Sequence, residues 1–167
     1  MPLLVLMVCL SVILFAKTAS AQNSAETERA DLGIVPIDDP GMADAIRQAR
    51  KTLPKFLALA EAPRSTITRF AVKLGVGAKD EKEYFWITSF QRKGRDFVGV
   101  LANDLETVET IKRGERLTFK EGDIVDWLYR EHGEMKGNYT GCALIKRKPR
   151  QEAEALKKEF RFSDCEL

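Results

Sequence analysis

The segment DIVDWLYREHGEMKGNYTG, residues 123–141, holds most of the side chains whose types and spacing could do chemistry. Asp123 and Asp126 could form a carboxylate pair, in which one group with a raised pKa acts as an acid while the other stays ionised. However, residues three apart on a strand point to opposite faces of a sheet. We therefore favour structural roles: Asp123 caps the turn after Gly122, and Asp126 points to solvent or accepts backbone amides near Trp127.

The same segment contains His132, the only histidine of the chain, around which any zinc site or catalytic triad would have to be built. Zinc usually takes several Cys or His ligands. The sequence contains no HExxH, CxxC or GxSxG motif. We therefore predict a solvated histidine at a turn tip, and we expect no catalytic residue, no metal and no cofactor.

Asn138, Tyr139 and Thr140 supply an amide, a phenol and a hydroxyl that could line a polar pocket or bind a peptide end. The alternative is a turn in which Asn138 adopts a left-handed backbone and Tyr139 packs its ring on the sheet. These three residues also form an N-glycosylation acceptor pattern. Both tryptophans are expected in the core rather than on a stacking surface. The candidate binding residues are Asp123, Asp126, Trp127, Asn138, Tyr139 and Thr140.

Residues 1–21 have the features of a secretory signal peptide. An apolar run of 14 residues, 3–16, is followed by Ala19, Ser20 and Ala21, the small-x-small pattern before a cleavage site. We expect cleavage between Ala21 and Gln22, and a periplasmic or secreted protein. A retained anchor is the alternative, although crossing a bilayer takes about 20 apolar residues. No Lys or Arg precedes the run, which leaves an upstream start codon open. Residues 22–37 are polar and predict a flexible lead-in.

A helix is expected to begin at Asp39, whose side chain can cap it, followed by Pro40, which has no amide to leave unpaired. Pro54 should kink this helix, or break it and restart a second segment, because proline cannot donate to the carbonyl four residues back. The apolar stripe of the helix has spacings of three and four. It comprises Met42, Ile46, Ala49, Leu53, Phe56 and Ala60.

After the helix the apolar period changes to two. Residues 69–76 alternate in type and predict a half-buried strand, with Lys73 on its polar side. Residues 83–90 and 96–103 are apolar on both faces, as in strands in the middle of a sheet that a helix covers on one side. Residues 105–113 fit a short helix or a loop, and 116–119 predict another strand.

The segment that holds the candidate residues should continue the sheet. Residues 125, 127 and 129 would share one face of a strand, with 124, 126 and 128 on the other. His132 and Gly133 can form a tight turn, after which 134–136 return antiparallel and GNYTG turns the chain again. Pro149 can open a last helix, whose narrow apolar stripe comprises Ala153, Leu156 and Phe160. The predicted domain spans residues 38–147, and the final helix and tail span 148–167.

Charge and cysteine content narrow the class of protein. Without residues 1–21, 26 of the 27 basic side chains remain against 25 acidic ones, a balance that argues against nucleic acid as a partner. Two cysteines remain, Cys142 and Cys165, and in an oxidising compartment we favour a disulfide over free thiols or a redox pair. A basic run could touch anionic lipid or an acidic partner, but it is more often a solvated helix exterior. It comprises Lys146, Arg147, Lys148, Arg150, Lys157, Lys158 and Arg161.

Several pieces in order resemble the bacterial YegJ-like family, the domain of unknown function 2314. They are DDPGMADAIRQARKTLPKFL, FAVKLGV, YFWITSF, GVLAND and IKRGERLTFKEGDIVDWLYREHGEMKGNYT, within residues 38–140. The resemblance implies an α+β domain with a curved antiparallel sheet against one main helix, and it supplies no established activity. The prediction is thus a curved antiparallel sheet of about five strands packed against one main N-terminal helix, with a short C-terminal helix.

We therefore expect a non-enzymatic module of the bacterial envelope that binds a protein or peptide through its sheet or sheet edge. No stable membrane insertion is expected after cleavage, and the sequence leaves the oligomeric state open. An immunity-like role is one version of this hypothesis. The alternatives are a small hydrolase or ligand-binding enzyme that uses Asp123, Asp126, Tyr139 and His132, and a scaffold or stress protein without a discrete site.

Overall fold

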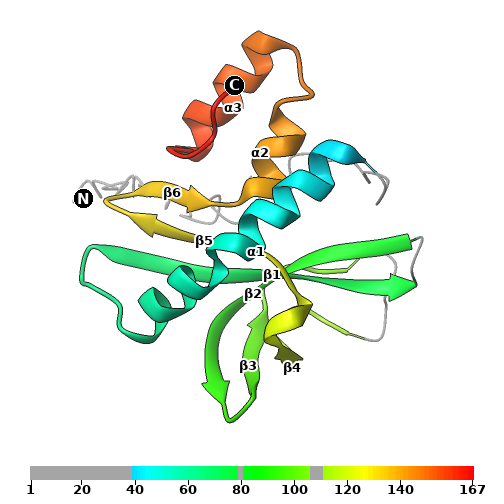
Figure 1. Ribbon diagram of the computed structural model, residues 1–167, viewed down its shortest axis with the longest axis vertical. Coiled ribbons are helices and arrows are strands. Elements are labelled where there is room, and N and C mark those ends of the chain that lie inside the picture. Colours follow the sequence, from blue (N-terminus) through cyan, green and yellow to red (C-terminus); the bar gives the residue numbers. More distant parts are fainter. Residues whose placement is uncertain (1–38, 79–80, 106–110) are drawn as a thin grey trace, which may run out of the picture. The chain divides into compact units, whose positions relative to one another are not determined.

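The computed structural model describes residues 39–78, 81–105 and 111–167, and these form an α+β domain with one antiparallel sheet (Figure 1). The elements are α1 (Pro40–Glu61), β1 (Ile67–Ala78), β2 (Glu81–Lys93), β3 (Asp96–Leu101), β4 (Arg116–Lys120), the 3-10 turn η2 (Glu121–Asp123), β5 (Ile124–Glu131), β6 (Glu134–Gly137), α2 (Tyr139–Ile145) and α3 (Arg150–Phe160). The sheet order is β4-β3-β2-β1-β5-β6, so β4 and β6 are its two edges. The predicted fold class is confirmed, with six strands instead of about five. The predicted signal peptide and lead-in lie outside the described residues.

Helix α1 begins as the sequence predicts. The Asp39 carboxylate accepts a hydrogen bond from the Met42 N–H (2.8 Å), and Pro40 occupies the first helical position. The helix continues through Pro54, so the predicted break is wrong; the proline lies on the exposed side. The buried face of α1 comprises Met42, Ala45, Ala49, Leu53, Phe56 and Leu57.

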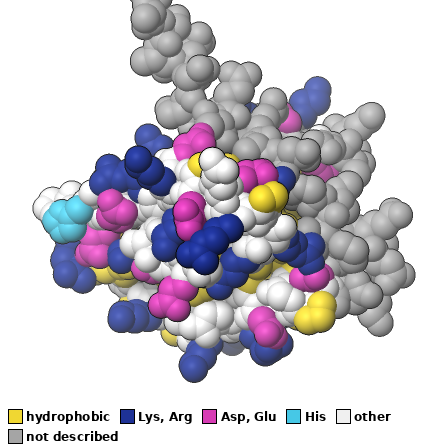
Figure 2. Space-filling view, turned by 90° about the horizontal axis from the view of Figure 1, so that it is seen from above, with side chains coloured by type: hydrophobic (Ala, Val, Ile, Leu, Met, Phe, Trp, Pro, Cys, Tyr) yellow, Lys and Arg dark blue, Asp and Glu magenta, His cyan; other side chains and the backbone are white. Residues whose placement is uncertain are grey.

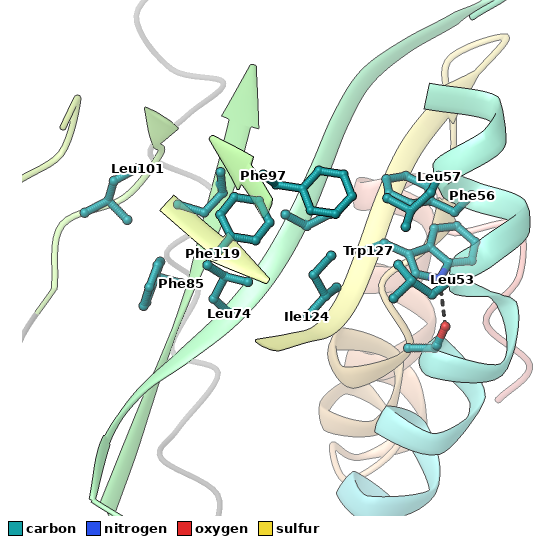
Figure 3. Packing of buried hydrophobic residues seen from close by; sticks show 13 residues of the cluster. Leu53, Phe56, Leu57, Leu74, Phe85, Phe97, Leu101, Phe119, Ile124 and Trp127 are labelled. Carbon is teal, nitrogen blue, oxygen red and sulfur yellow. Dashed lines mark hydrogen bonds between the residues drawn. The ribbon is translucent and has the colours of Figure 1, made fainter. Parts of the chain in front are cut away.

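The main core lies between α1 and the sheet and continues beyond the helix over β3 and β4 (Figure 3). Beneath α1, the Phe56 ring stacks on Trp127 with centroids 4.8 Å apart, and the Trp127 indole N–H donates to the Ala49 carbonyl (3.0 Å). Farther along the sheet, Phe97 of β3 stacks on Phe119 of β4 at 5.6 Å. Trp127 is only 6% exposed, which confirms its predicted place in the core.

The middle of β1, residues 71–74, is buried on both faces, so the prediction of a half-buried strand is wrong for this part. Val72 and Leu74 belong to the main core, while Ala71 and Lys73, on the opposite face, are also buried. The reason is topological, because β1 pairs with β2 on one side and β5 on the other and thus lies in the middle of the sheet.

A β-bulge corrects the predicted faces of β5. Asp126 pairs with Lys73, but Ile124 pairs with the next β1 residue, Leu74, so Val125 is an extra residue in the ladder. As a result Ile124 and Trp127 both enter the main core, although simple alternation assigned them to opposite faces. Strict alternation fails here because a bulge shifts all side chains on one side of it by one position.

The C-terminal part combines predicted and unpredicted turns. His132 and Gly133 both have positive φ (52° and 81°) and join β5 to β6 as predicted. Asn138 is left-handed (φ 52°), also as predicted, but it opens α2, a helix that the sequence did not reveal. Helix α3 follows Pro149 and buries Ala153. Among the described residues, every helix is too short or too polar to cross a membrane.

Candidate functional sites at the two ends of the sheet

A buried polar cluster joins β1, β5 and α2. One Asp126 carboxylate oxygen accepts hydrogen bonds from the Thr140 hydroxyl (2.6 Å) and the Thr140 N–H (2.8 Å). The other accepts from the backbone N–H groups of Trp127 (2.8 Å) and Tyr139 (3.3 Å). The Lys73 ammonium group donates to the Thr140 hydroxyl (2.7 Å). The cluster therefore ties a central strand, its neighbour and the start of α2 together.

The cluster is closed to solvent. Asp126 is 0% exposed, Thr140 4% and Lys73 9%. Burial raises the pKa of the Asp126 carboxyl, while the Lys73 ammonium group and the hydrogen bonds from Thr140 and Trp127 act in the opposite direction. Lys73 also lies over the Trp86 ring, 4.5 Å from its centroid. In the described part of the chain, every buried side-chain nitrogen or oxygen has a hydrogen-bond partner, as expected of a structural network.

The two aspartates do not form a carboxylate pair. The Asp123 carboxylate is exposed on η2 and accepts a hydrogen bond from the Lys120 N–H (2.8 Å), which confirms its role in capping the turn. Of the two structural roles predicted for Asp126, exposure to solvent is wrong and acceptance of backbone amides is confirmed. The sequence did not predict that Lys73 belongs to this cluster, because alternation assigned its side chain to a solvated face. A lysine between the apolar residues Val72 and Leu74 was the signal that could have indicated it.

The other candidate binding residues also satisfy one another. The Asn138 side chain accepts from the Gly141 N–H (3.2 Å) and caps α2. The Tyr139 ring packs edge-on against Trp127, with centroids 5.6 Å apart, and its hydroxyl accepts from Thr52 (3.5 Å). The structure thus brings Asp126, Trp127, Asn138, Tyr139 and Thr140 together as a folding unit, in which the polar side chains of Asp126 and Thr140 are buried and those of Asn138 and Tyr139 are half-buried.

His132 is exposed at its turn, as predicted. Within the described ranges, no three His, Cys, Asp or Glu side chains are placed to hold a metal ion.

The mixed charge of one face is visible in Figure 2, where basic and acidic side chains lie among one another. Several members of the predicted basic run pair with acids. These ion pairs are Arg147–Asp39, Lys148–Glu152, Arg150–Glu154 and Arg161–Glu134.

A depression of about 340 Å³ lies between α1 and η2 and is lined by Arg50, Leu53, Glu121 and Gly122. The Arg50 guanidinium already donates to the Ile124 carbonyl (3.3 Å) and lies 3.5 Å from the Gly122 carbonyl. The Arg50 guanidinium is thus engaged with backbone carbonyls, and the depression is open to solvent. The depression therefore does not have the convergent polar groups of an enclosed ligand site.

At one end of the sheet, the C-terminal tail covers β6. The Met135 N–H donates to the Arg161 carbonyl (2.8 Å), and the Ser163 N–H donates to the Met135 carbonyl (3.2 Å), so the tail continues the sheet in parallel at this point. The Lys136 ammonium group pairs with Asp164 (3.1 Å). These contacts occupy the outward backbone groups of Met135 with a segment of the same chain.

A disulfide fixes the tail. Cys142 of α2 and Cys165 are bonded, with their Cα atoms 5.5 Å apart, so the predicted pairing is present. Around it lies a second apolar cluster, separate from the main core. It comprises Met135, Cys142, Ile145, Ala153, Phe162 and Cys165.

At the other end of the sheet, no strand within the described ranges pairs with the outer edge of β4. The Leu101 N–H donates to the Glu115 carbonyl (2.9 Å), which shows that Glu115 faces β3. Backbone groups of alternate strand residues point to opposite sides, so Leu117 and Phe119 also face β3, while Arg116, Thr118 and Lys120 face outward. The Lys120 N–H donates to the Asp123 carboxylate. Thr118 lies at the centre of the outer edge of β4.

The side chains of β4 also alternate. Phe119 is buried in the core, whereas Arg116, Thr118 and Lys120 are exposed on the opposite face. Among the described residues, no strand pairs with the outer side of β4. The sequence predicted this strand but did not identify it as an edge, because position in a sheet depends on which strands pair.

Comparison with known proteins gives a family without an assigned activity. A family model described as "Uncharacterized protein conserved in bacteria", the domain of unknown function 2314, matches residues 39–162. The "Uncharacterized protein YegJ" of Escherichia coli (strain K12) is 31% identical over 145 residues, which cover 87% of this chain and 91% of that protein. No solved structure matches.

Proposed function

Because the chain belongs to the bacterial family of domain of unknown function 2314, for which no activity is described, we propose its role from the fold. The protein is a non-enzymatic interaction module that binds an extended segment of a partner protein along the outer edge of β4. Binding of this kind adds a strand to an existing sheet, and main-chain hydrogen bonds supply much of the affinity.

The open edge of β4 is the observation that carries this proposal. An edge strand presents unpaired N–H and C=O groups, and proteins commonly cover such edges or blunt them. Here β6 is covered by the tail, which bonds to both the N–H and the C=O of Met135. On β4, by contrast, the side chains on the sheet face opposite the core are exposed. In the described part of the chain, the fold therefore covers one edge with its own tail and pairs no strand with the outer side of the other.

The rival hypothesis of a small hydrolase receives less support. Its proposed groups, Asp123 and Asp126, occupy a turn cap and a closed cluster, and a substrate would have to displace several hydrogen bonds to reach Asp126. A general acid or base must lie within hydrogen-bond reach of its substrate. The envelope remains the compartment that we propose, on the basis of the N-terminal apolar run and the cysteine pair.

The test removes one edge donor without breaking the sheet. In Thr118→Pro, the lost N–H points away from β3, and proline is tolerated on an edge strand in this orientation. The matched control, Thr118→Val, keeps the backbone donor. Affinity capture from envelope extracts should recover a specific protein with wild type and Thr118→Val but not with Thr118→Pro. Circular dichroism and thermal unfolding should show that both variants are folded, and recovery unchanged by Thr118→Pro would refute binding at β4.

Export has its own test. Mass spectrometry of the protein from fractionated cells should find a mature N-terminus at Gln22 in the soluble envelope fraction. An intact Met1 terminus on membrane-bound protein would contradict cleavage.

A further inference from the structure

The charged side chains of β4 define which strand could bind there. Arg116 and Lys120 are exposed on the same face of the sheet, four residues apart, with Thr118 between them. Resting on the proposed function, we infer that the partner is an extended acidic segment whose two carboxylate side chains, also four residues apart, lie opposite Arg116 and Lys120. Opposite charges directly across neighbouring strands stabilise the pairing, and like charges destabilise it.

The same charges disfavour a second copy of this chain as the occupant. If two β4 strands paired antiparallel about Thr118, Arg116 of each copy would lie opposite Lys120 of the other. Both outer pairs would then be cation against cation, which is the arrangement that natural edge strands use against self-association. A partner with acidic side chains at these two positions replaces both repulsions by attractions.

The neighbours of the two cations make their contributions unequal. Across the ladder, Lys120 lies opposite the acidic residue Asp96 of β3, whereas Arg116 lies opposite Val100. We therefore assign the larger part of the acidic preference to Arg116. Beyond Lys120, the Asp123 carboxylate marks the end of the edge. An acidic residue of the partner beyond this point would meet a like charge, so the favoured acids are confined to the two positions.

The inference is tested with three synthetic peptides. The acidic probe is acetyl-Thr-Glu-Val-Thr-Val-Glu-Thr-amide, and the other two replace both Glu residues by Gln or by Lys. Binding is followed by amide chemical shifts of the 15N-labelled chain at low and high salt. We expect the acidic probe to shift the amides of β4 and to bind at least about fivefold more tightly than the Lys peptide, as two cross-strand charge pairs allow. Added salt should reduce this difference by screening.

Charge-reversal variants test whether Arg116 and Lys120 cause the preference for the acidic peptide. Arg116→Glu should reverse the order of the acidic and Lys peptides, and Lys120→Glu should change it less. A matched control, Lys158→Glu on the exposed side of α3, should leave the order unchanged. If all three peptides shift β4 equally, the acidic preference is wrong while the proposed edge binding stands. If none shifts β4, or if the acidic peptide shifts α3 and is unaffected by Arg116→Glu, both proposals fail.

Discussion

The two ends of the sheet differ, although both are edges of one antiparallel sheet: the tail of the chain covers β6, whereas no described strand pairs with the outer side of β4. At the β6 end, the tail, a disulfide and the Asp126 cluster join β5, β6 and α2 through contacts distant in sequence. At the β4 end, the strand is held on its inner side by β3 and by core aromatics, while no strand of the described residues pairs with its outer side. Among the described residues, the links between distant segments are thus concentrated at the β6 end, and the β4 end is the edge that we propose for binding.

The largest expected effect comes from breaking the cluster at the β6 end. Asp126→Ala removes a buried negative charge beside Lys73 and the acceptor of several backbone amides, at a cost of about 3–5 kcal/mol in unfolding free energy. Thr140→Val, which retains all three backbone amide donors to Asp126, should cost about 1–3 kcal/mol. Urea unfolding measures both values. Equal, small losses in the two variants would show that the cluster is not a main support of this end.

Opening the disulfide should have the next largest effect. Replacing both Cys142 and Cys165 by Ser should lower the unfolding free energy by about 3 kcal/mol, since the bond closes a loop of 23 residues. Hydrogen exchange should quicken more at the Met135 amide, which bonds to the tail, than at the Phe119 amide of β4. Wild type treated with a reducing agent should behave like the double variant. Unchanged protection of Met135 would show that the tail covers β6 without the bond.

A smaller effect concerns pH. Burial raises the pKa of Asp126 above its ordinary value of 3.8, so the folded state holds this proton more tightly than the unfolded state. The resulting stabilisation is complete below the ordinary pKa and is lost as pH rises through the raised pKa. Relative to Asp126→Asn, which does not titrate, wild type should therefore become less stable as pH rises from about 4. Urea unfolding across pH checks this, and parallel curves for the two proteins would contradict it.

The smallest expected loss of stability concerns the turn that ends the β4 edge. Asp123→Ala removes the acceptor of the Lys120 N–H, and because the site is exposed, the expected loss of stability is about 1 kcal/mol. The open edge should lengthen by one donor, seen as faster exchange of the Lys120 amide. Glu121→Ala in the same turn is the control, because its carboxylate lies near Arg92 and not on a strand amide. Equal rates of hydrogen exchange at the Lys120 amide in both variants would show that the Asp123 carboxylate does not protect this amide.

Local signals in the sequence predicted local structure well. The Asp39–Pro40 start of α1, the His132–Gly133 turn and the left-handed Asn138 each depend on one or two residues, and each is confirmed. The short helix α2 was missed because it has no stripe long enough to show a helical period. The bulge at Val125 was missed because pairing with β1, not the β5 sequence, creates it.

The sequence by itself determined the fold class, where most of the strands lie along the chain, the cap of α1 and the residue types needed for a disulfide. Only the tertiary structure decided that Lys73, Asp126 and Thr140 meet in one buried cluster, because they come from three segments whose neighbours are fixed by sheet pairing. It also decided which strands are edges and which edge the tail covers. The segment that looked reactive is therefore a folding unit, and the candidate for binding lies on β4, where accessible backbone groups depend on strand order.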